Sequence, residues 1–162
     1  MSKNKAIFLD RDGVINKEYS DYVKSLDELE IFPNIWKPIK KLTDSKFQII
    51  VITNQSAINR KLTTHKKVQE IHSRIQKYLN ENGTAIDRFY YCPHTPQECC
   101  DCRKPKTGML LEAIKDFEID IKSSWFIGDS DSDMEAARKV GCKNIKIDSN
   151  ISLEDAVKKI LG

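Results

Sequence analysis

The sequence predicts a single α/β domain, residues 1–162, in which helices cover both faces of a mainly parallel, five-stranded sheet. Short apolar runs alternate with longer segments whose apolar residues recur every three or four positions. A crossover helix is the usual link between parallel strands, so this alternation indicates a Rossmann-like three-layer sandwich. The 162 residues, 40% hydrophobic and 31% charged, are enough for one core but short for two.

The individual strands and helices are predicted from the hydrophobic pattern and from residues typical of element ends. The predicted strands cover residues 6–9, 48–53, 89–91, 125–128 and 144–148, and the last alternates as an edge strand does. The predicted helices cover residues 35–45, 64–82, 108–117, 131–140 and 152–161. Asn82-Gly83 is a typical helix end, and Ser152 with Asp155 resembles an N-terminal capping box. Two irregular stretches, 17–32 and 92–106, are long for mere connections, which suggests that they are functional.

Two carboxylates, Asp10 and Asp12, follow the first strand, ahead of Gly13. Like charges repel, and burying them is costly, so a buried strand has no structural need for this pair. At the carboxyl edge of a parallel sheet, the pair can hold a cation and attack an electrophile. An ordinary Asp-Gly turn explains the stretch equally well. The residues at the other strand ends must therefore distinguish a catalytic site from a turn.

Polar residues also follow the second and fourth strands. Thr-Asn-Gln-Ser, residues 53–56, supplies a hydroxyl, amides and free backbone N–H groups that can hold phosphate oxygens, although a polar turn would look the same. Asp129 ends the fourth strand, and Asp131 and Asp133 then open a helix, where acids are favourable anyway. Together, Asp10 and Asp129 predict a hard-cation site, most simply for Mg²⁺.

A basic and cysteine-rich segment lies between the third and fourth strands. Arg103 and Lys104 can bind a phosphate dianion, whereas a solvated loop is the ordinary alternative. Four of the five cysteines fall between residues 92 and 102, and this odd, crowded set favours metal over disulfides. Three thiolates and an imidazole predict a closed structural Zn²⁺ site in loop 92–102, its ligands being Cys92, His94, Cys100 or Cys99, and Cys102.

In order, Asp-x-Asp-Gly from Asp10, Thr53, Lys104 and Gly-Asp-x-x-x-Asp from Gly128 resemble the phosphatases of the haloacid dehalogenase (HAD) superfamily. Asp-Arg-Asp-Gly-Val-Ile-Asn, Thr-Asn-Gln-Ser, Tyr-Tyr-Cys-Pro-His and Cys-Asp-Cys-Arg-Lys-Pro resemble its branch of D-glycero-D-manno-heptose 1,7-bisphosphate 7-phosphatases, over residues 6–146. Histidinol-phosphate phosphatases are close relatives with the same metal loop. The resemblance implies a capless, HAD-like fold that carries a zinc loop.

The resemblance also implies roles. Asp10 is the expected nucleophile, and Asp12 the expected general acid and then base. Mg²⁺ is expected on Asp10, Asp129 and the backbone carbonyl of Asp12, with Ser130 and Asp133 in support. Expected phosphate or substrate contacts are Thr53, Asn54, Gln55, Ser56, Arg60, Arg103, Lys104, Glu18 and Asp21.

Two features leave the substrate open. Ala57 and Lys61 stand where the branch has glycines. The preferred substrate is a small phosphorylated sugar, the heptose bisphosphate, ahead of histidinol phosphate. A nucleic-acid end phosphatase and a non-catalytic, zinc-stabilised binding module are the weaker alternatives.

Bulk properties give the remaining expectations. The net charge is +3 without a basic block, which argues against nucleic-acid or membrane partners. An apolar signal or membrane-spanning run is not evident, so a cytoplasmic protein is expected, as a monomer. His65 and His72 lie in a charged helical segment and are expected to be solvated, whereas Cys142 is expected to be a small buried residue.

Overall fold

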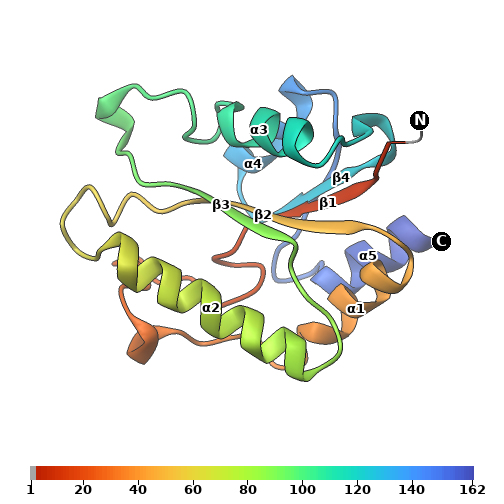
Figure 1. Cartoon of the computed structure of the whole chain (residues 1–162), viewed down its shortest axis with the longest axis horizontal. Helices are drawn as coiled ribbons and strands as arrows, with labels where there is room; N and C mark the ends of the chain where they lie inside the picture. Colours follow the sequence, from red (N-terminus) through yellow and green to blue (C-terminus); the bar gives the residue numbers. More distant parts are fainter. Residues whose placement is uncertain (1–2) are drawn as a thin grey trace.

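The computed structural model describes residues 3–162 and contains one sheet of five strands in the order β3-β2-β1-β4-β5 (Figure 1). All four strand pairings are parallel. The strands are β1 (Ala6–Leu9), β2 (Gln48–Asn54), β3 (Arg88–Cys92), β4 (Trp125–Gly128) and β5 (Lys143–Lys146). The predicted fold class is confirmed, and the sheet is wholly rather than mainly parallel.

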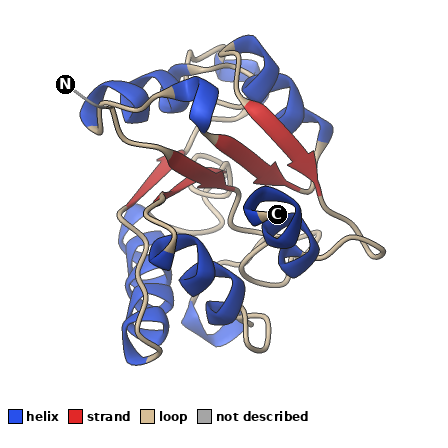
Figure 2. Cartoon of the chain, turned by 90° about the vertical axis from the view of Figure 1, so that its right-hand side faces the viewer, coloured by secondary structure: helices blue, strands red, loops and turns tan. Residues whose placement is uncertain are grey.

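Helices form a layer on each side of the sheet (Figures 1 and 2). One layer holds α1 (Trp36–Asp44), α2 (His65–Glu81) and α5 (Leu153–Leu161), and the other holds α3 (Gly108–Asp116) and α4 (Asp131–Lys139). Short 3₁₀ turns occur at Leu26–Glu28, Pro96–Glu98 and Ile121–Ser123. The predicted boundaries agree with these to within two residues, and those of β1 and β4 are identical. None of the described helices is both long enough and apolar enough to span a membrane.

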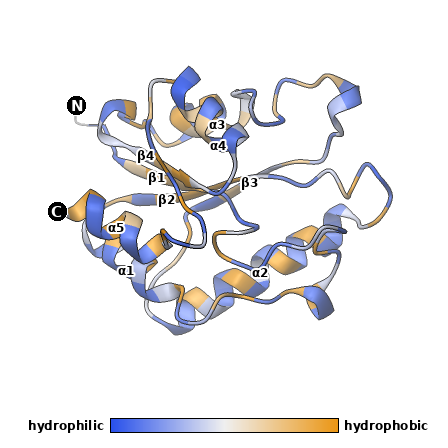
Figure 3. Ribbon diagram, turned by 180° about the vertical axis from the view of Figure 1, so that it is seen from behind, coloured by the Kyte–Doolittle hydropathy of each residue, from blue (hydrophilic) through white to orange (hydrophobic). Residues whose placement is uncertain are grey.

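Alternation along the strands divides the core into two halves. In β1, Ile7 and Leu9 pack in the cluster that includes α1, α2 and α5, whereas Ala6 and Phe8 pack in the cluster with α3 and α4. All four side chains are 0% exposed, because successive residues of a strand face opposite sides and both sides are covered. The ribbon coloured by hydropathy shows the same arrangement, with apolar strands between the layers (Figure 3).

The prediction that His72 is solvated was wrong. His72 is only 6% exposed and stacks on Phe89 of β3, with ring centroids 4.4 Å apart. The reason is helical spacing: His72 lies four residues after Val68 and three before Ile75, on the face of α2 that packs on the sheet. His65, one residue past the N-cap Thr64, is exposed as expected, and Cys142 is buried as expected.

The parallel arrangement sends the carboxyl ends of β1, β2 and β4 to the same edge of the sheet. Asp10 follows β1, Asn54 ends β2, and Asp129 follows β4. The two long irregular stretches flank this edge, which is where ligands bind in open α/β sheets.

Candidate active site

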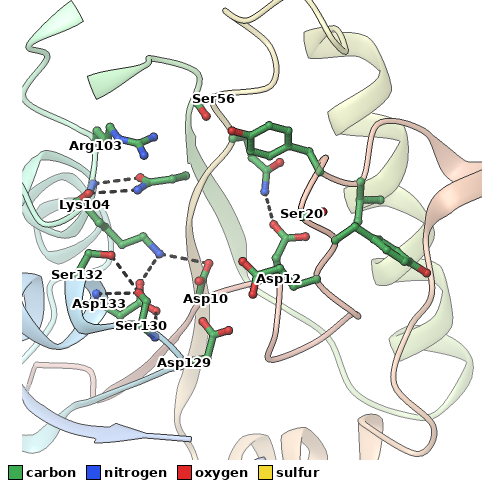
Figure 4. Close-up of a pocket in the computed structure, with 16 residues that line it drawn as sticks. Asp10, Asp12, Ser20, Ser56, Arg103, Lys104, Asp129, Ser130, Ser132 and Asp133 are labelled. Atoms are coloured by element: carbon green, nitrogen blue, oxygen red, sulfur yellow. Dashed lines mark hydrogen bonds and ion pairs between the residues drawn. The ribbon is translucent and has the colours of Figure 1, made fainter. Parts of the chain in front are cut away.

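A cavity of about 290 Å³ opens at this edge (Figure 4). Most of the predicted site residues line it, and they come from segments far apart in the sequence. The predicted residues that line the cavity are Asp10, Asp12, Glu18, Asn54, Gln55, Ser56, Arg103, Lys104, Asp129, Ser130 and Asp133.

Three carboxylates converge at the base of the cavity. Asp10, Asp129 and Asp133 each offer an oxygen, and these oxygens all lie within 4.8 Å of one another. Two glycines make room for them. A Cβ on Gly13, whose φ is +83°, would lie 1.9 Å from Oδ2 of Asp129, and a Cβ on Gly128 would lie 2.3 Å from Oδ2 of Asp133. The acids therefore occupy the space that side chains would fill at these positions.

Burial and mutual repulsion raise the pKa values of Asp10 and Asp129. Burial raises the pKa of Asp10 to about 7, with Lys104 opposing the rise and Asp133 adding to it. Burial likewise raises the pKa of Asp129 to about 6, helped by the nearby negative charge of Glu18. These carboxylates are hard oxygen donors, and without a cation they resist ionisation. Mg²⁺ prefers such donors, and its charge would favour their ionised form.

Lys104 supplies the positive charge of the cluster. It is 3% exposed, and its Nζ donates to Asp133 Oδ1 at 2.6 Å and to the carbonyl of Ile52 at 2.7 Å, while lying 3.2 Å from Asp10 Oδ1. Burial alone would lower its pKa, but Asp10 and Asp133 outweigh burial and raise it. The side-chain amide of Asn54 fixes the Lys104 backbone by bonding both its N–H and its carbonyl.

Asp12 is held by donors on both oxygens. Oδ1 accepts from Arg11 Nη2 at 2.8 Å and from Asn16 Nδ2 at 3.0 Å, and Oδ2 accepts from Gln55 Nε2 at 2.8 Å. Burial would raise the pKa of Asp12, but the Arg11 guanidinium and these hydrogen bonds together lower it. Arg11 and Asn16 were not predicted as part of the site, since charged and amide side chains in a short polar turn are normally solvated.

The cysteine-rich loop brings four metal-ligand atoms together. Cys92 Sγ lies 3.7 Å from Cys100 Sγ and 2.9 Å from Cys102 Sγ, and Nδ1 of His94 lies 3.3 Å from Cys92 Sγ. Three thiols and an imidazole at such separations fit tetrahedral Zn²⁺. Cys99 adopts a left-handed backbone conformation, and its exposed thiol lies against the carbonyl of Gln97. The geometry therefore favours Cys100 over Cys99 as the third ligand.

Three predicted contacts do not line the cavity. Thr53 is fully buried and accepts from Gln55, Asp21 is exposed and pairs with Lys24, and Arg60 lies over the ring of Tyr22, 5.9 Å away. Five further residues line the cavity: Tyr19 and Ser20, which fall between the predicted contacts Glu18 and Asp21 but were not singled out, and Tyr22, Val23 and Ser132, which were not predicted. Four of these five lie in the irregular stretch 17–32, whose length marked the segment as functional but could not single out residues.

This fold and this site define a class of protein, and comparison with known proteins agrees. A family model described as "Polynucleotide kinase 3 phosphatase" matches residues 5–154. The chain belongs to this family of HAD-superfamily phosphatases, and it is an enzyme.

Its relatives narrow the class to one kind of phosphatase. A D-glycero-beta-D-manno-heptose-1,7-bisphosphate 7-phosphatase of Pseudomonas aeruginosa is 40% identical over 141 residues, 87% of this chain and 79% of the relative. A probable enzyme of this kind from Thermoplasma volcanium is 40% identical over 137 residues, 84% of this chain and 93% of the relative. Among solved structures, a D,D-heptose 1,7-bisphosphate phosphatase from B. bronchiseptica, complexed with magnesium and phosphate, has a TM-score of 0.90 at 29% identity, covering 97% of this chain and 98% of that one.

Proposed function

We propose that this enzyme removes the 7-phosphate of D-glycero-β-D-manno-heptose 1,7-bisphosphate. The observation that carries the proposal is the convergence of Asp10, Asp12 and Lys104 in one cavity of about 290 Å³, with Asp10 Oδ1 3.2 Å from Lys104 Nζ. The substrate comes from the relatives that the chain is similar to, several of which are named for the β-heptose bisphosphate. A cavity of this size matches a small phosphosugar.

The proposed reaction has two steps. In the first, a carboxylate oxygen of Asp10 forms a bond to phosphorus while the bond from phosphorus to the sugar oxygen breaks. Asp12 gives a proton to that oxygen; its pKa is lowered in the free enzyme, and the negative charge of the bound phosphate would raise it so that Asp12 takes up this proton when substrate binds. In the second, Asp12 as a carboxylate takes a proton from water, whose oxygen attacks the aspartyl-phosphate. Inorganic phosphate leaves, and both acids return to their starting forms.

Other residues hold the phosphoryl group and orient these acids. The backbone N–H of Arg11 donates to Asp10 Oδ1 at 2.7 Å and, with Lys104, fixes the orientation of the nucleophile. Lys104 also faces the phosphoryl position with its positive charge. Asp133 holds Lys104 in place through the 2.6 Å ion pair, and Ser130 caps the helix that carries Asp133.

We assign Mg²⁺ to Asp10, Asp129 and the backbone carbonyl of Asp12, since Asp133 is fully buried and forms the shorter ion pair with Lys104, 2.6 Å against 3.2 Å for Asp10. When bound, Mg²⁺ would neutralise the repulsion between the carboxylates and the phosphate dianion. We assign a structural Zn²⁺ to Cys92, His94, Cys100 and Cys102, immediately before Arg103 and Lys104. The solved relative that contains magnesium and phosphate supports the first assignment.

The name of the matching family model favours a second candidate, a phosphatase acting on nucleic-acid ends. Against it, the net charge of only +3 is spread along the chain without a basic block, whereas nucleic-acid binding depends on clustered cations. Histidinol phosphate is a further alternative substrate, because the relatives that use it resemble the chain in the same metal loop.

We also propose that residues 1–162 work as one domain and as a monomer, because every side chain of the mechanism belongs to one sheet edge. We propose the cytoplasm as its location.

A panel of phosphate esters tests the substrate. We expect kcat/KM for the heptose bisphosphate to exceed by at least about 10-fold the values for fructose 1,6-bisphosphate, histidinol phosphate and a 3′-phosphorylated oligonucleotide, because a cavity shaped for one sugar discriminates by such factors. Activity should require Mg²⁺. The Asp10→Asn variant is the control and should be inactive on every ester. Near-equal values across the panel would contradict the substrate, and turnover by Asp10→Asn would contradict the mechanism.

A further inference from the structure

A buried guanidinium links the catalytic turn to helix α2. The side chain of Arg11 is 0% exposed. Its Nη2 donates to Asp12 Oδ1 at 2.8 Å, and its Nη1 lies 3.2 Å from Nε2 of His72. Within residues 3–162, Nε of Arg11 has no hydrogen-bond partner. The orientation of the guanidinium therefore depends on two partners, the carboxylate of Asp12 and the imidazole of His72.

The contact with Arg11 defines the protonation state of His72. A guanidinium only donates hydrogen bonds, so Nε2 of His72 must accept, and the ring must be neutral with its proton on Nδ1. Burial, with the positive charge of Arg11, lowers the pKa of His72 to about 3, which agrees with a neutral ring. The ring is fixed from the other side, because it stacks on Phe89 at an interplanar angle of 11° and meets Tyr91 edge-on.

We infer that His72 is a positioning residue: through Arg11, it holds the carboxylate of Asp12 in the orientation needed to reach the leaving oxygen. This inference rests on the proposed role of Asp12 as general acid. Without an acceptor at position 72, Nη1 of Arg11 would be buried and unpaired, and the guanidinium would turn toward a new partner at the expense of Asp12. Asn16 and Gln55 still hold Asp12, so the expected loss is partial.

A purely structural role for His72 makes the opposite predictions for two variants. His72→Phe keeps an aromatic ring to stack on Phe89 but removes the acceptor. His72→Gln loses the ring but keeps an acceptor within the reach of a flexible side chain. If His72 positions Asp12, the glutamine variant should be the more active of the two; if His72 only packs, the phenylalanine variant should be.

The measurement is the dependence of kcat/KM on the leaving group of the phosphate ester. A p-nitrophenolate leaves without a proton, whereas a sugar alkoxide needs one, so only the alkyl ester requires Asp12 as an acid in the first step. Because kcat/KM reports on steps up to the first irreversible one, it isolates this requirement from hydrolysis of the aspartyl-phosphate. The probes are p-nitrophenyl phosphate and whichever alkyl ester of the panel is turned over best.

For His72→Phe we expect kcat/KM on the alkyl ester to fall about 10-fold or more, and on the aryl ester less than about 3-fold, as for loss of a supporting hydrogen bond. His72→Gln should restore most of the alkyl activity. Arg11→Lys, which retains the charge but cannot contact both partners, should reproduce the selective loss and serves if His72→Phe does not fold. Ser73→Ala, on the exposed face of the same helix, should leave both values unchanged.

The outcomes separate this inference from the proposed function. If Asp12→Asn loses activity selectively on the alkyl ester but His72→Phe and Arg11→Lys do not, the positioning role is wrong and the function stands. Equal losses on both esters, or a glutamine variant less active than the phenylalanine one, also overturn it. If Asp12→Asn shows no leaving-group dependence, the role of Asp12 as general acid fails, and the inference fails with it.

Discussion

Gly13 shows how a single missing side chain shapes the site. Its backbone is in the left-handed region, φ +83°, and the carboxylate of Asp129 occupies the position that a Cβ would take. Two physical requirements therefore coincide at one residue: a conformation that L side chains rarely adopt, and a close approach of backbone to a metal-binding acid.

We predict that Gly13→Ala displaces Asp129 and weakens Mg²⁺ binding about 10- to 100-fold, the range seen when the support of a metal ligand is lost. The measurement is the Mg²⁺ dependence of kcat/KM. Gly141→Ala is the matched control, because Gly141 has a similar φ of +77°, but a Cβ added there would meet no described atom within 4 Å. If both variants lose Mg²⁺ affinity equally, backbone strain and not the clash with Asp129 is the cause.

Residues of the site differ in how far the sequence reveals them. Asp10, Asp129 and Lys104 could be predicted, because each stands in a recognisable motif at a strand end or beside metal ligands. Arg11 and His72 could not. Arg11 stands between two acids in a short turn. Helical spacing accounts for the burial of His72 but does not reveal its partner, because the two residues pair across 61 positions, which no local pattern contains.

At the scale of elements, the cysteine-rich loop, the proposed zinc loop, connects β3 to Arg103 and Lys104, the residues proposed to hold phosphate. Cys92 is the last residue of β3, and Arg103 follows the ligand Cys102 directly. The backbone N–H of Arg103 lies 3.3 Å from Cys100 Sγ, and its Nη1 donates to the carbonyl of His94. Zn²⁺ in this loop would therefore fix the segment that carries Lys104.

We predict that Cys100→Ser loses Zn²⁺ and raises KM for the substrate several-fold, because Arg103 and Lys104 lose their anchor. Zinc content by elemental analysis and steady-state kinetics check both parts. Cys99→Ser is the control: it removes a neighbouring thiol that points away from the cluster and should keep both zinc and KM unchanged. A chelator should mimic Cys100→Ser in the wild-type enzyme. Zinc-free protein with a normal KM would contradict the anchoring role.

The elements themselves were largely predictable, since the inner strands are apolar runs, the last strand alternates, and the helices have an apolar stripe. The structure of the stretch 17–32 could not be predicted; only its length indicated that it is functional. Tyr22 has a φ of +70°, and Tyr19 and Tyr22 line the cavity from irregular backbone without periodic signal.

At the scale of the whole molecule, the parallel sheet gathers its acids at one edge at a cost in stability. The unfolded chain ionises these acids near their ordinary pKa of 3.8, whereas in the fold the pKa of Asp10 is about 7 and that of Asp129 about 6. Between these limits the metal-free folded protein holds more protons than the unfolded chain. The free energy of unfolding contributed by Asp10 and Asp129 therefore falls as the pH rises from about 4 to about 7.

Bound Mg²⁺ replaces those protons, so its stabilising effect should depend on pH. At 100 times its dissociation constant, a ligand adds about 2.7 kcal/mol, which corresponds to a rise in Tm of about 5–10 °C for a domain of this size. We expect a rise of this order at pH 8 and a smaller one at pH 5 at the same Mg²⁺ concentration, because protons compete for the carboxylates. Thermal unfolding at fixed Zn²⁺ measures both, and Asp129→Asn should lose most of the rise at pH 8. Equal rises at the two pH values would contradict the displacement of protons from Asp10 and Asp129 by Mg²⁺.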